Sequence, residues 1–341
     1  MNEHSNKLTL TKLLKEGEEC YYLGQYEKGI SLLSQVIKID PSYAEAYYWR
    51  GKCFDWKEEY DLALVDFFTA VEFNPSYADA YCDLGSLLMQ YNDYDSAIEN
   101  LSSAIRLEST NTCFLSSRAS AFAVLGRFED ALADYNKAID LDPDDPINYQ
   151  NRGKMRFNQQ EYLIAVNDFT TAIKIVESSS KDEKEKSYLY ADRAEAYEEA
   201  EQFQQAIADY ILILSIDPKN VNSLTRIGLI YQTLEDYQTA LSIFTQALSL
   251  EEDSAFLLRL RGNTYVELDE EILAFSDFNT AIAIEPSSPL YYDRAEAFYI
   301  FENYANALDD LDSALELPVT KKLLGYIEEA RNTCLKEMGI N

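Results

Sequence analysis

Histidine is nearly missing from this chain of 341 residues, because His4 is the only one. Serine or cysteine nucleophiles that rely on histidine, and zinc sites built from histidine, therefore lack the residue that their chemistry needs. A phosphate-binding loop of the G-x-x-x-x-G-K type is also missing. We therefore expect no enzymatic activity, no resident metal and no cofactor.

Positive charge is scarce as well: 29 Lys and Arg stand against 60 Asp and Glu, which gives a net charge of −31. Nucleic acids and anionic membrane surfaces are poor partners for such a chain, because both bind basic protein surfaces. The excess of acid has two interpretations. Its field steers a basic partner toward the protein, or it only keeps a long chain soluble.

Long apolar runs and paired cysteines are likewise missing. No stretch reaches the roughly 18 apolar residues of a membrane span, and the first residues lack the apolar region of a signal peptide. The 5 cysteines are scattered and form no C-x-x-C pair, which suits reduced thiols. We expect no membrane insertion and a cytoplasmic location.

What the chain has instead is a repeating block of about 34 residues. A small residue marks the same point of every block. These markers are Gly17, Gly51, Gly85, Ala119, Gly153, Ala194, Gly228, Gly262 and Ala295. A second Gly or Ala follows each marker at a constant distance, as Ala63 follows Gly51. A fixed period of this size indicates stacked structural repeats and argues against one globular core.

Each block predicts two helices. In the second block Tyr47, Gly51 and Phe54 share one face of a first helix, and Tyr60, Ala63 and Phe67 begin the apolar face of a second. Proline then ends the second helix. It does so at Pro41, Pro75, Pro143, Pro218 and Pro286. Paired small residues let two helices approach closely, which offsets the roughly 1 kcal/mol that glycine costs in a helix relative to alanine.

These residues resemble the tetratricopeptide repeat family. The second block carries the pattern as Gly51, Phe54, Tyr60, Ala63, Phe67, Ala70 and Pro75, and the seventh carries it as Gly228, Tyr231, Tyr237, Ala240, Phe244 and Ala247. Arg156 and Glu271 depart from it at aromatic positions. The resemblance implies an all-α, right-handed superhelical solenoid of nine helix-turn-helix repeats, with a C-terminal capping helix.

Three regions follow from this register. Residues 1–9 are expected to form a flexible N-terminal tail, and residues 10–319 the nine-repeat solenoid. Residues 320–341 are expected to hold a capping helix and a tail, because the last repeat of a solenoid must cover its apolar end. An insertion at 178–186 lengthens one spacing. It is either a solvated loop or an early start of the next helix near Lys181, with Ser180 and Glu183 as a capping box. We expect the helix, projecting by about one to two turns.

Six repeats share a charged pair at a fixed spacing. An Arg directly precedes the marker, and an Asp follows at a constant distance in the same repeat. The pairs are Arg50 and Asp66, Arg118 and Asp134, Arg152 and Asp168, Arg193 and Asp209, Arg261 and Asp277, and Arg294 and Asp310. The remaining three repeats lack both residues. Joint presence favours an ion pair across the two helices, within about 4 Å, over a ladder of ligand-binding arginines.

Function is expected in a groove, since the resemblance implies that the first helices line a concave surface. The candidate partner-binding residues there are Tyr22, Tyr48, Trp49, Trp56, Glu18 and Asp55. Large aromatics are the usual anchors of interfaces, and acids beside them favour a partner with basic as well as aromatic residues. The alternative is that the tryptophans pack between helices. A second set facing inward combines aromatics and acids later in the chain, including Tyr292, Glu296 and Tyr299.

The resulting functional prediction is a protein-protein interaction scaffold or adaptor that binds a peptide or helix of a partner protein in its concave groove. Two alternatives are a chaperone-type holder of client proteins and a regulatory subunit of an enzyme complex. Some relatives of the family clamp acidic C-terminal tails with Lys, Arg and Asn. Here Arg259 and Asn263 match that clamp loosely, but Asp293 replaces the next Asn. We therefore expect no carboxylate clamp.

Overall fold

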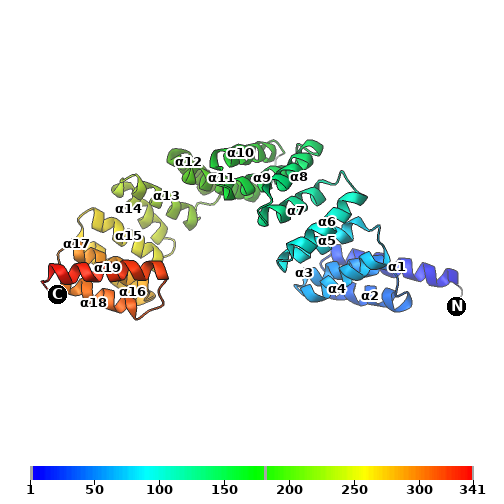
Figure 1. The fold of residues 1–341 in the computed structure, drawn as a ribbon, viewed down its shortest axis with the longest axis horizontal. Helices are drawn as coiled ribbons and strands as arrows, with labels where there is room; N and C mark the ends of the chain where they lie inside the picture. The colour runs from blue at the N-terminus through cyan, green and yellow to red at the C-terminus, as the bar shows by residue number, and fades with distance from the viewer. Residues whose placement is uncertain (1–2, 180–182, 340–341) are drawn as a thin grey trace. The chain divides into compact units, whose positions relative to one another are not determined.

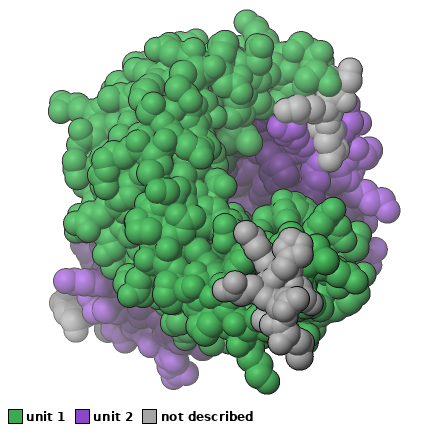
Figure 2. Space-filling view, turned by 90° about the vertical axis from the view of Figure 1, so that its right-hand side faces the viewer, with its two compact units in different colours: residues 1–180 green, residues 181–341 purple. Residues whose placement is uncertain are grey.

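The computed structural model describes residues 3–179 and 183–339. Over these residues the chain is helical throughout and contains no strand. It divides into two compact units, Met1–Ser180 and Lys181–Asn341, which are described separately here (Figure 2).

The first unit consists of helices that pack as consecutive antiparallel pairs (Figure 1). The pairs are α1 (Glu3–Tyr22) with α2 (Tyr26–Ile39), α3 (Ala44–Trp56) with α4 (Tyr60–Phe73), α5 (Ala78–Gln90) with α6 (Tyr94–Leu107), α7 (Thr112–Val124) with α8 (Phe128–Leu141), and α9 (Pro146–Asn158) with α10 (Tyr162–Ser178).

The second unit repeats this arrangement and adds one helix. Its pairs are α11 (Glu183–Glu199) with α12 (Phe203–Ile216), α13 (Val221–Thr233) with α14 (Tyr237–Leu248), α15 (Ala255–Glu267) with α16 (Glu271–Ile284), and α17 (Ser288–Ile300) with α18 (Tyr304–Leu315). The last helix, α19 (Lys321–Glu337), buries Ile327 and Cys334 against α17 and α18. The prediction of nine helix pairs followed by a capping helix is confirmed.

Close approach of the two helices in a pair explains the small markers. A Cβ atom added to Gly51 would lie 2.8 Å from the ring of Phe67, and one added to Gly153 would lie 2.7 Å from the ring of Phe169. Both rings are 1% exposed and come from the second helix of the same pair. The second small residue of each repeat, such as Ala63, is also fully buried. Bulky side chains therefore pack around a contact that has no room for one.

Turns between the paired helices follow one geometry. A single residue with positive φ stands in each turn, at Gly24, Glu58, Asn92, Gly126, Gln160, Glu201, Glu235, Asp269 and Glu302. The left-handed conformation reverses the chain within a few residues and ends the first helix. The predicted prolines have the matching role after the second helix. For example, α4 ends at Phe73 and Pro75 follows, and α8 ends at Leu141 and Pro143 follows.

The six predicted Arg–Asp pairs all form, each between the two helices of one repeat. The shortest nitrogen–oxygen distances are 2.7 Å for Arg50–Asp66, Arg118–Asp134 and Arg261–Asp277, and 2.6 Å for Arg152–Asp168, Arg193–Asp209 and Arg294–Asp310. Each guanidinium donates through Nε and Nη2 to the two carboxylate oxygens, as from Arg50 to Asp66. The ion-pair prediction is confirmed, and these arginines are structural.

Arginines of this series also reach the preceding repeat. Nη1 of Arg50 donates to Ser34 at 3.1 Å, and Nη1 of Arg118 donates to Ser102 at 3.0 Å. The equivalent bonds run from Arg152 to Asn136 and from Arg294 to Asn279. Each of these arginines thus connects three helices. Arg156, which replaces an aromatic residue of the repeat pattern, binds the same carboxylate as Arg152, because its Nη1 donates to Asp168 at 2.8 Å.

Two predicted boundaries can be compared with the helices. Residues 3–9, expected in the N-terminal tail, are helical and belong to α1; no Pro or Gly interrupts the sequence before Gly17, and the helix continues upstream. The described part of α11 begins at Glu183, and this helix has 17 residues where α9 and α13 have 13. The first helix of repeat six therefore projects by about one turn, as predicted. Ser180 and Lys181 lie outside the described residues.

Removing Asp168 should destabilise the fold far more than removing a surface charge. Asp168 is 3% exposed and pairs with both Arg152 and Arg156, so Asp168→Ala leaves two partly buried guanidinium groups without their acceptor. We expect a loss of about 2–4 kcal/mol in the free energy of unfolding. Asp312→Ala is the matched control, because the Arg331–Asp312 pair is about half exposed, and it should cost under about 0.5 kcal/mol. Urea unfolding checks both values, and equal losses would contradict the structural role.

Two glycine substitutions should have opposite signs. Gly153→Ala gains helix propensity but forces the buried ring of Phe169 to move, so we expect a net loss of about 1–2 kcal/mol. Gly325→Ala in α19 meets nothing within 4 Å, so the same change should stabilise by about 0.5–1 kcal/mol. Thermal unfolding of the two variants measures the difference. Stabilisation by both would show that the markers are not close-contact sites.

Candidate partner-binding surfaces

Of the four predicted groove aromatics, two are exposed to solvent, one is partly buried and one is buried. Tyr22 is 69% exposed and Trp56 is 61% exposed. Tyr48 is only 8% exposed and belongs to the core, with its ring 4.7 Å from that of Tyr77 and 6.0 Å from that of Phe67. The prediction that Tyr48 faces a partner is therefore wrong, because a tyrosine at the start of the next repeat covers it.

The tryptophans differ in the same way. Trp49 is partly buried and contacts the rings of Tyr21, Tyr22 and Tyr48 at centroid distances of 5.1 to 5.6 Å. Packing between helices, the alternative interpretation, holds for Trp49. Trp56 stacks on Tyr26 at 6.0 Å with an interplanar angle of 10°, and its Nε1 donates to the Tyr21 hydroxyl at 2.9 Å. Its ring is thus exposed and also held in one orientation.

Two predicted carboxylates, Glu18 and Asp55, lie close in sequence to the exposed rings. Glu18 lies one helical turn before Tyr22 on α1, and Asp55 directly precedes Trp56 on α3. Burial is the main cause that raises the pKa of Asp55; the charge of Asp83 adds to it, and that of Lys52 opposes it. Lys52 is itself committed to Asp83 at 2.9 Å. We name the group of Glu18, Tyr22, Asp55 and Trp56 the α1–α3 surface; its two rings are exposed and its two carboxylates are half-buried.

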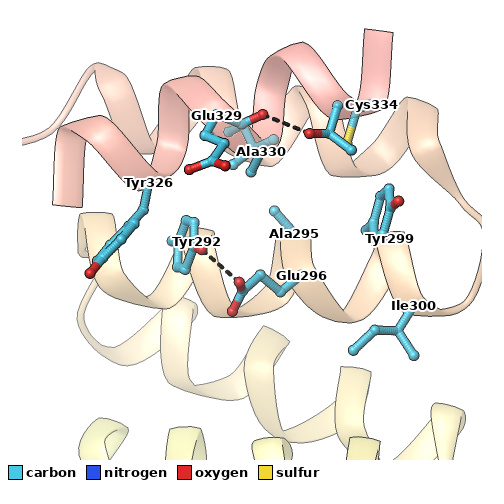
Figure 3. Close-up of a pocket in the computed structure, with 11 residues that line it drawn as sticks. Tyr292, Ala295, Glu296, Tyr299, Ile300, Tyr326, Glu329, Ala330 and Cys334 are labelled. Carbon is cyan, nitrogen blue, oxygen red and sulfur yellow. Dashed lines mark hydrogen bonds between the residues drawn. The ribbon is translucent and has the colours of Figure 1, made fainter. Parts of the chain in front are cut away.

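A second site is a pocket of about 370 Å³ between α17 and α19, which we name the α17–α19 pocket (Figure 3). Three tyrosines line it: Tyr292 and Tyr299 from α17, and Tyr326 from α19. Glu296 and Glu329 approach from the two opposing helices, as the close-up shows. No Lys or Arg is among the residues that line this pocket.

The electrostatics of this pocket favour a cation. The Tyr292 hydroxyl donates to Glu296 at 2.6 Å. Burial, then this bond and the neighbouring acids, raises the pKa of Tyr292, so the phenol remains a neutral donor. Burial also raises the pKa of Glu296; the Tyr292 bond opposes this shift, and the charge of Asp293 adds to it. Aromatic faces carry negative potential, so rings and carboxylates attract the same kind of ligand.

Two basic residues lie near the pocket, but neither is among the residues that line it. The Nζ of Lys322 lies 5.8 Å from the centroid of Tyr326, on the same helix. Arg331 of α19 pairs with Asp312 at 2.7 Å and is not part of the lining. The two pocket carboxylates are therefore without a basic residue in their own cavity.

The sequence pattern predicted residues on the α17 side of this pocket. Tyr292, Glu296 and Tyr299 were in the second set expected to face inward, because they occupy first-helix positions of the ninth repeat. The pocket positions of Tyr326 and Glu329 were not predicted, because α19 lies outside the repeats and the 34-residue pattern does not extend to it. Their spacing from Ile327 and Cys334, which are buried, was the available signal: residues beside a buried stripe border the neighbouring helix.

The positions that loosely match a carboxylate clamp are occupied internally. Asn263 Nδ2 donates to Asp293 at 2.8 Å, and Arg259 Nε lies 3.6 Å from the same oxygen. Burial raises the pKa of Asp293, and these two partners oppose that shift. Among the described residues, no cluster of His, Cys, Asp and Glu has a geometry suited to a metal ion, and none of the helices there combines the length and hydrophobicity of a membrane span.

Curated relatives match only part of their own length. RNA polymerase II-associated protein 3 of Rattus norvegicus is 25% identical over 126 residues, which is 37% of this chain and 18% of that protein. DnaJ homolog subfamily C member 7 of Homo sapiens is 25% identical over 204 residues, 58% of this chain and 35% of that protein. This chain thus spans about a fifth to a third of the relatives it matches.

Solved structures share the fold. The Cut9–Hcn1 hetero-tetramer of APC/C aligns with a TM-score of 0.54 at 19% identity, covering 77% of this chain and 49% of the matched chain. The pilF protein of Pseudomonas aeruginosa aligns with a TM-score of 0.53 at 15% identity, covering 68% of this chain and 99% of that one.

Family comparison matches the repeats directly. The family described as "TPR repeat" matches residues 17–54 and 119–160, and the one described as "Tetratricopeptide repeat" matches residues 78–111, 187–220 and 221–254. Together these segments cover more than half of the chain. With the helix pairs, small contact residues and terminal prolines described above, they establish that the chain belongs to the tetratricopeptide repeat family.

Proposed function

We propose that this protein is an adaptor that holds a segment of a partner protein by taking a Lys or Arg side chain into the α17–α19 pocket. The observation that carries the proposal is the pocket itself: three tyrosines and two carboxylates enclose about 370 Å³ with no basic residue in the lining. Rings bind the aliphatic stem of such a side chain, and Glu296 and Glu329 bind its charged end. The net charge of −31 favours a basic partner as well.

Binding fits these observations better than catalysis does. The pocket contains two carboxylates but no histidine. Its thiol, Cys334, is 1% exposed, and burial raises the pKa of Cys334, which disfavours the reactive thiolate. A repeat scaffold presents side chains on rigid helices, which lowers the entropy lost when a partner binds. The partner's chemistry is therefore a basic residue with apolar neighbours that contact Tyr299, Ile300 and Tyr326 on the pocket rim.

A peptide with one lysine tests the pocket. The probe is a short synthetic peptide of a single Lys flanked by apolar residues, and its matched control replaces Lys with norleucine, which keeps the stem and removes the charge. We expect the norleucine peptide to bind at least about tenfold more weakly, and Glu296→Gln to cause a similar loss for the Lys peptide. Isothermal titration calorimetry measures both affinities.

The control for this experiment is Asp312→Asn, which removes one acid from the same region without touching the pocket. It should leave the affinity for the Lys peptide unchanged. Equal affinities for the Lys and norleucine peptides, or equal losses with Glu296→Gln and Asp312→Asn, would contradict a pocket that recognises charge.

The affinity should also depend on pH. Burial raises the pKa of Glu296 in the free protein, whereas a bound cation stabilises its carboxylate. Binding of the Lys peptide therefore releases a proton, and the affinity should fall as the pH is lowered through the pKa of Glu296. Glu296→Gln should flatten this dependence over the same pH range. A wild-type affinity that does not change with pH would be the contrary result.

The α1–α3 surface is a second candidate site, supported by the exposed and oriented ring of Trp56. Both tryptophans of the protein, Trp49 and Trp56, are on α3, so tryptophan emission reports on this surface. If a basic peptide binds here, its addition should shift the emission, and Trp56→Ala should weaken binding by about tenfold while the protein stays folded. Binding without an emission change would exclude this surface and leave the α17–α19 pocket.

A further inference from the structure

The series of Arg contacts between repeats is interrupted at the third repeat, between Arg50 and Arg118. In the fourth repeat, Arg118 connects Asp134 of its own repeat to Ser102 of the preceding one. The three equivalent positions one repeat earlier are all different. They hold Leu84, Asn100 and Phe68. A guanidinium that fills the junction between two repeats is therefore replaced by a shorter apolar side chain, and both of its acceptors are lost as well.

A cavity occupies the place of that guanidinium. It measures about 400 Å³ and lies between α4, α5 and α6. Leu84 and Leu88 of α5 line it together with Leu64, Val65 and Phe68 of α4. Leu84 is 3% exposed, whereas Val65 is 61% and Phe68 is 60% exposed. The cavity is thus an open apolar notch, which we name the α4–α6 notch.

The outer face of α4 extends this apolar surface. Leu62, Val65 and Phe68 follow one another at helical spacing and are 49%, 61% and 60% exposed. The same three positions one repeat later are polar. They are Ser96, Glu99 and Ser102. A face that is polar in the following repeat is thus apolar here, in and beside the notch, which is a feature of interaction surfaces.

Acids border this surface. Asp61 and Glu72 of α4 and Asp95 and Glu99 of α6 are exposed, and Glu99 also lines the notch. The basic residue of α6, Arg106, lies about two turns from Glu99 and donates to Ser103 at 2.8 Å. A second copy of this chain would place the same carboxylates opposite one another. The charge of the border therefore selects a basic partner and disfavours self-association.

We propose that the α4–α6 notch docks an amphipathic helix of a partner protein. One bulky apolar side chain of that helix enters between Phe68 and Leu88, its apolar neighbours cover Leu62 and Val65, and its Lys or Arg residues face Glu72 and Glu99. This surface is formed mainly by the second helices of repeats two and three, so it is separate from the α1–α3 surface and from the α17–α19 pocket. The protein then has a docking surface in addition to the proposed cation sites.

The probe for this proposal is a synthetic 18-residue amphipathic helix with a Leu face bordered by Lys. One control peptide replaces the Lys residues with Glu, and a second replaces the Leu residues with Ser. Fluorescence anisotropy on the full chain gives the affinities, and hydrogen exchange locates the bound peptide. We expect binding of the Leu/Lys peptide alone, with added protection within residues 60–73 and 94–107.

The decisive variant restores the Arg series at the third repeat: Phe68→Ser, Leu84→Arg and Asn100→Asp together reproduce the contacts of Ser102, Arg118 and Asp134 and fill the notch. It should fold and lose at least tenfold in affinity for the Leu/Lys peptide. Two single variants guard against misfolding of the triple: Phe68→Ser removes an exposed ring, and Glu99→Lys reverses a border charge, and each should weaken binding at least fivefold. Asp312→Asn, on α18 and outside all three surfaces, is the control and should leave this affinity unchanged.

Contrary results are equally defined. Wild-type affinity in Phe68→Ser and Glu99→Lys, no added protection in α4 and α6, or equal binding of the Glu control peptide would overturn the proposal. No binding of the Leu/Lys peptide at micromolar concentrations would do the same. A wild-type dimer that Phe68→Ser converts to a monomer, measured by sedimentation equilibrium, would assign the notch to self-association and overturn the proposed partner.

Discussion

The rest of the structure depends on the close approach of two helices at a small residue. Where the marker is Gly51 or Gly153, the ring of Phe67 or Phe169 lies directly on the backbone of the first helix and is fully buried. The depth of that ring fixes the separation of the helices, and the left-handed residue in the turn fixes their direction. Repetition of this contact builds the core of each unit from packing within a repeat and between neighbouring repeats. Each repeat is therefore stabilised mainly by its neighbours in the sequence.

The charged pairs depend on that separation. An Arg beside the marker reaches a buried Asp with two parallel hydrogen bonds only if the helices stay close, and its third donor then bonds to the preceding repeat, as from Arg50 to Ser34. Where such an arginine bonds to the preceding repeat, as Arg50 and Arg118 do, it makes the junction between the two repeats polar. Where Leu84 replaces one, the junction opens into the α4–α6 notch, so a single contact type explains both the regular surface and its interruption.

Periodicity made most of the fold predictable, because a small residue at the contact between the paired helices recurs in all nine repeats of the sequence. Joint presence of Arg and Asp was enough to predict ion pairs, since neither residue is tolerated in a buried site alone. Tyr48 shows where this reasoning ends. Tyr48 and Trp56 lie on the same helix, but Tyr77 of the following repeat packs on Tyr48, whereas Trp56 is 61% exposed. The repeat pattern could not predict the pocket positions of Tyr326 and Glu329, because α19 lies outside the repeats.

Recognition of a basic side chain between α17 and α19 is the proposal on which the function of this acidic protein depends. A crystal structure of the chain with the single-lysine peptide tests this recognition most directly. We expect the lysine stem to lie against Tyr292 and Tyr326, with Nζ within hydrogen-bond distance of the Glu296 carboxylate. A bound peptide whose lysine points to solvent, or one seated elsewhere on the chain with the pocket empty, would contradict it.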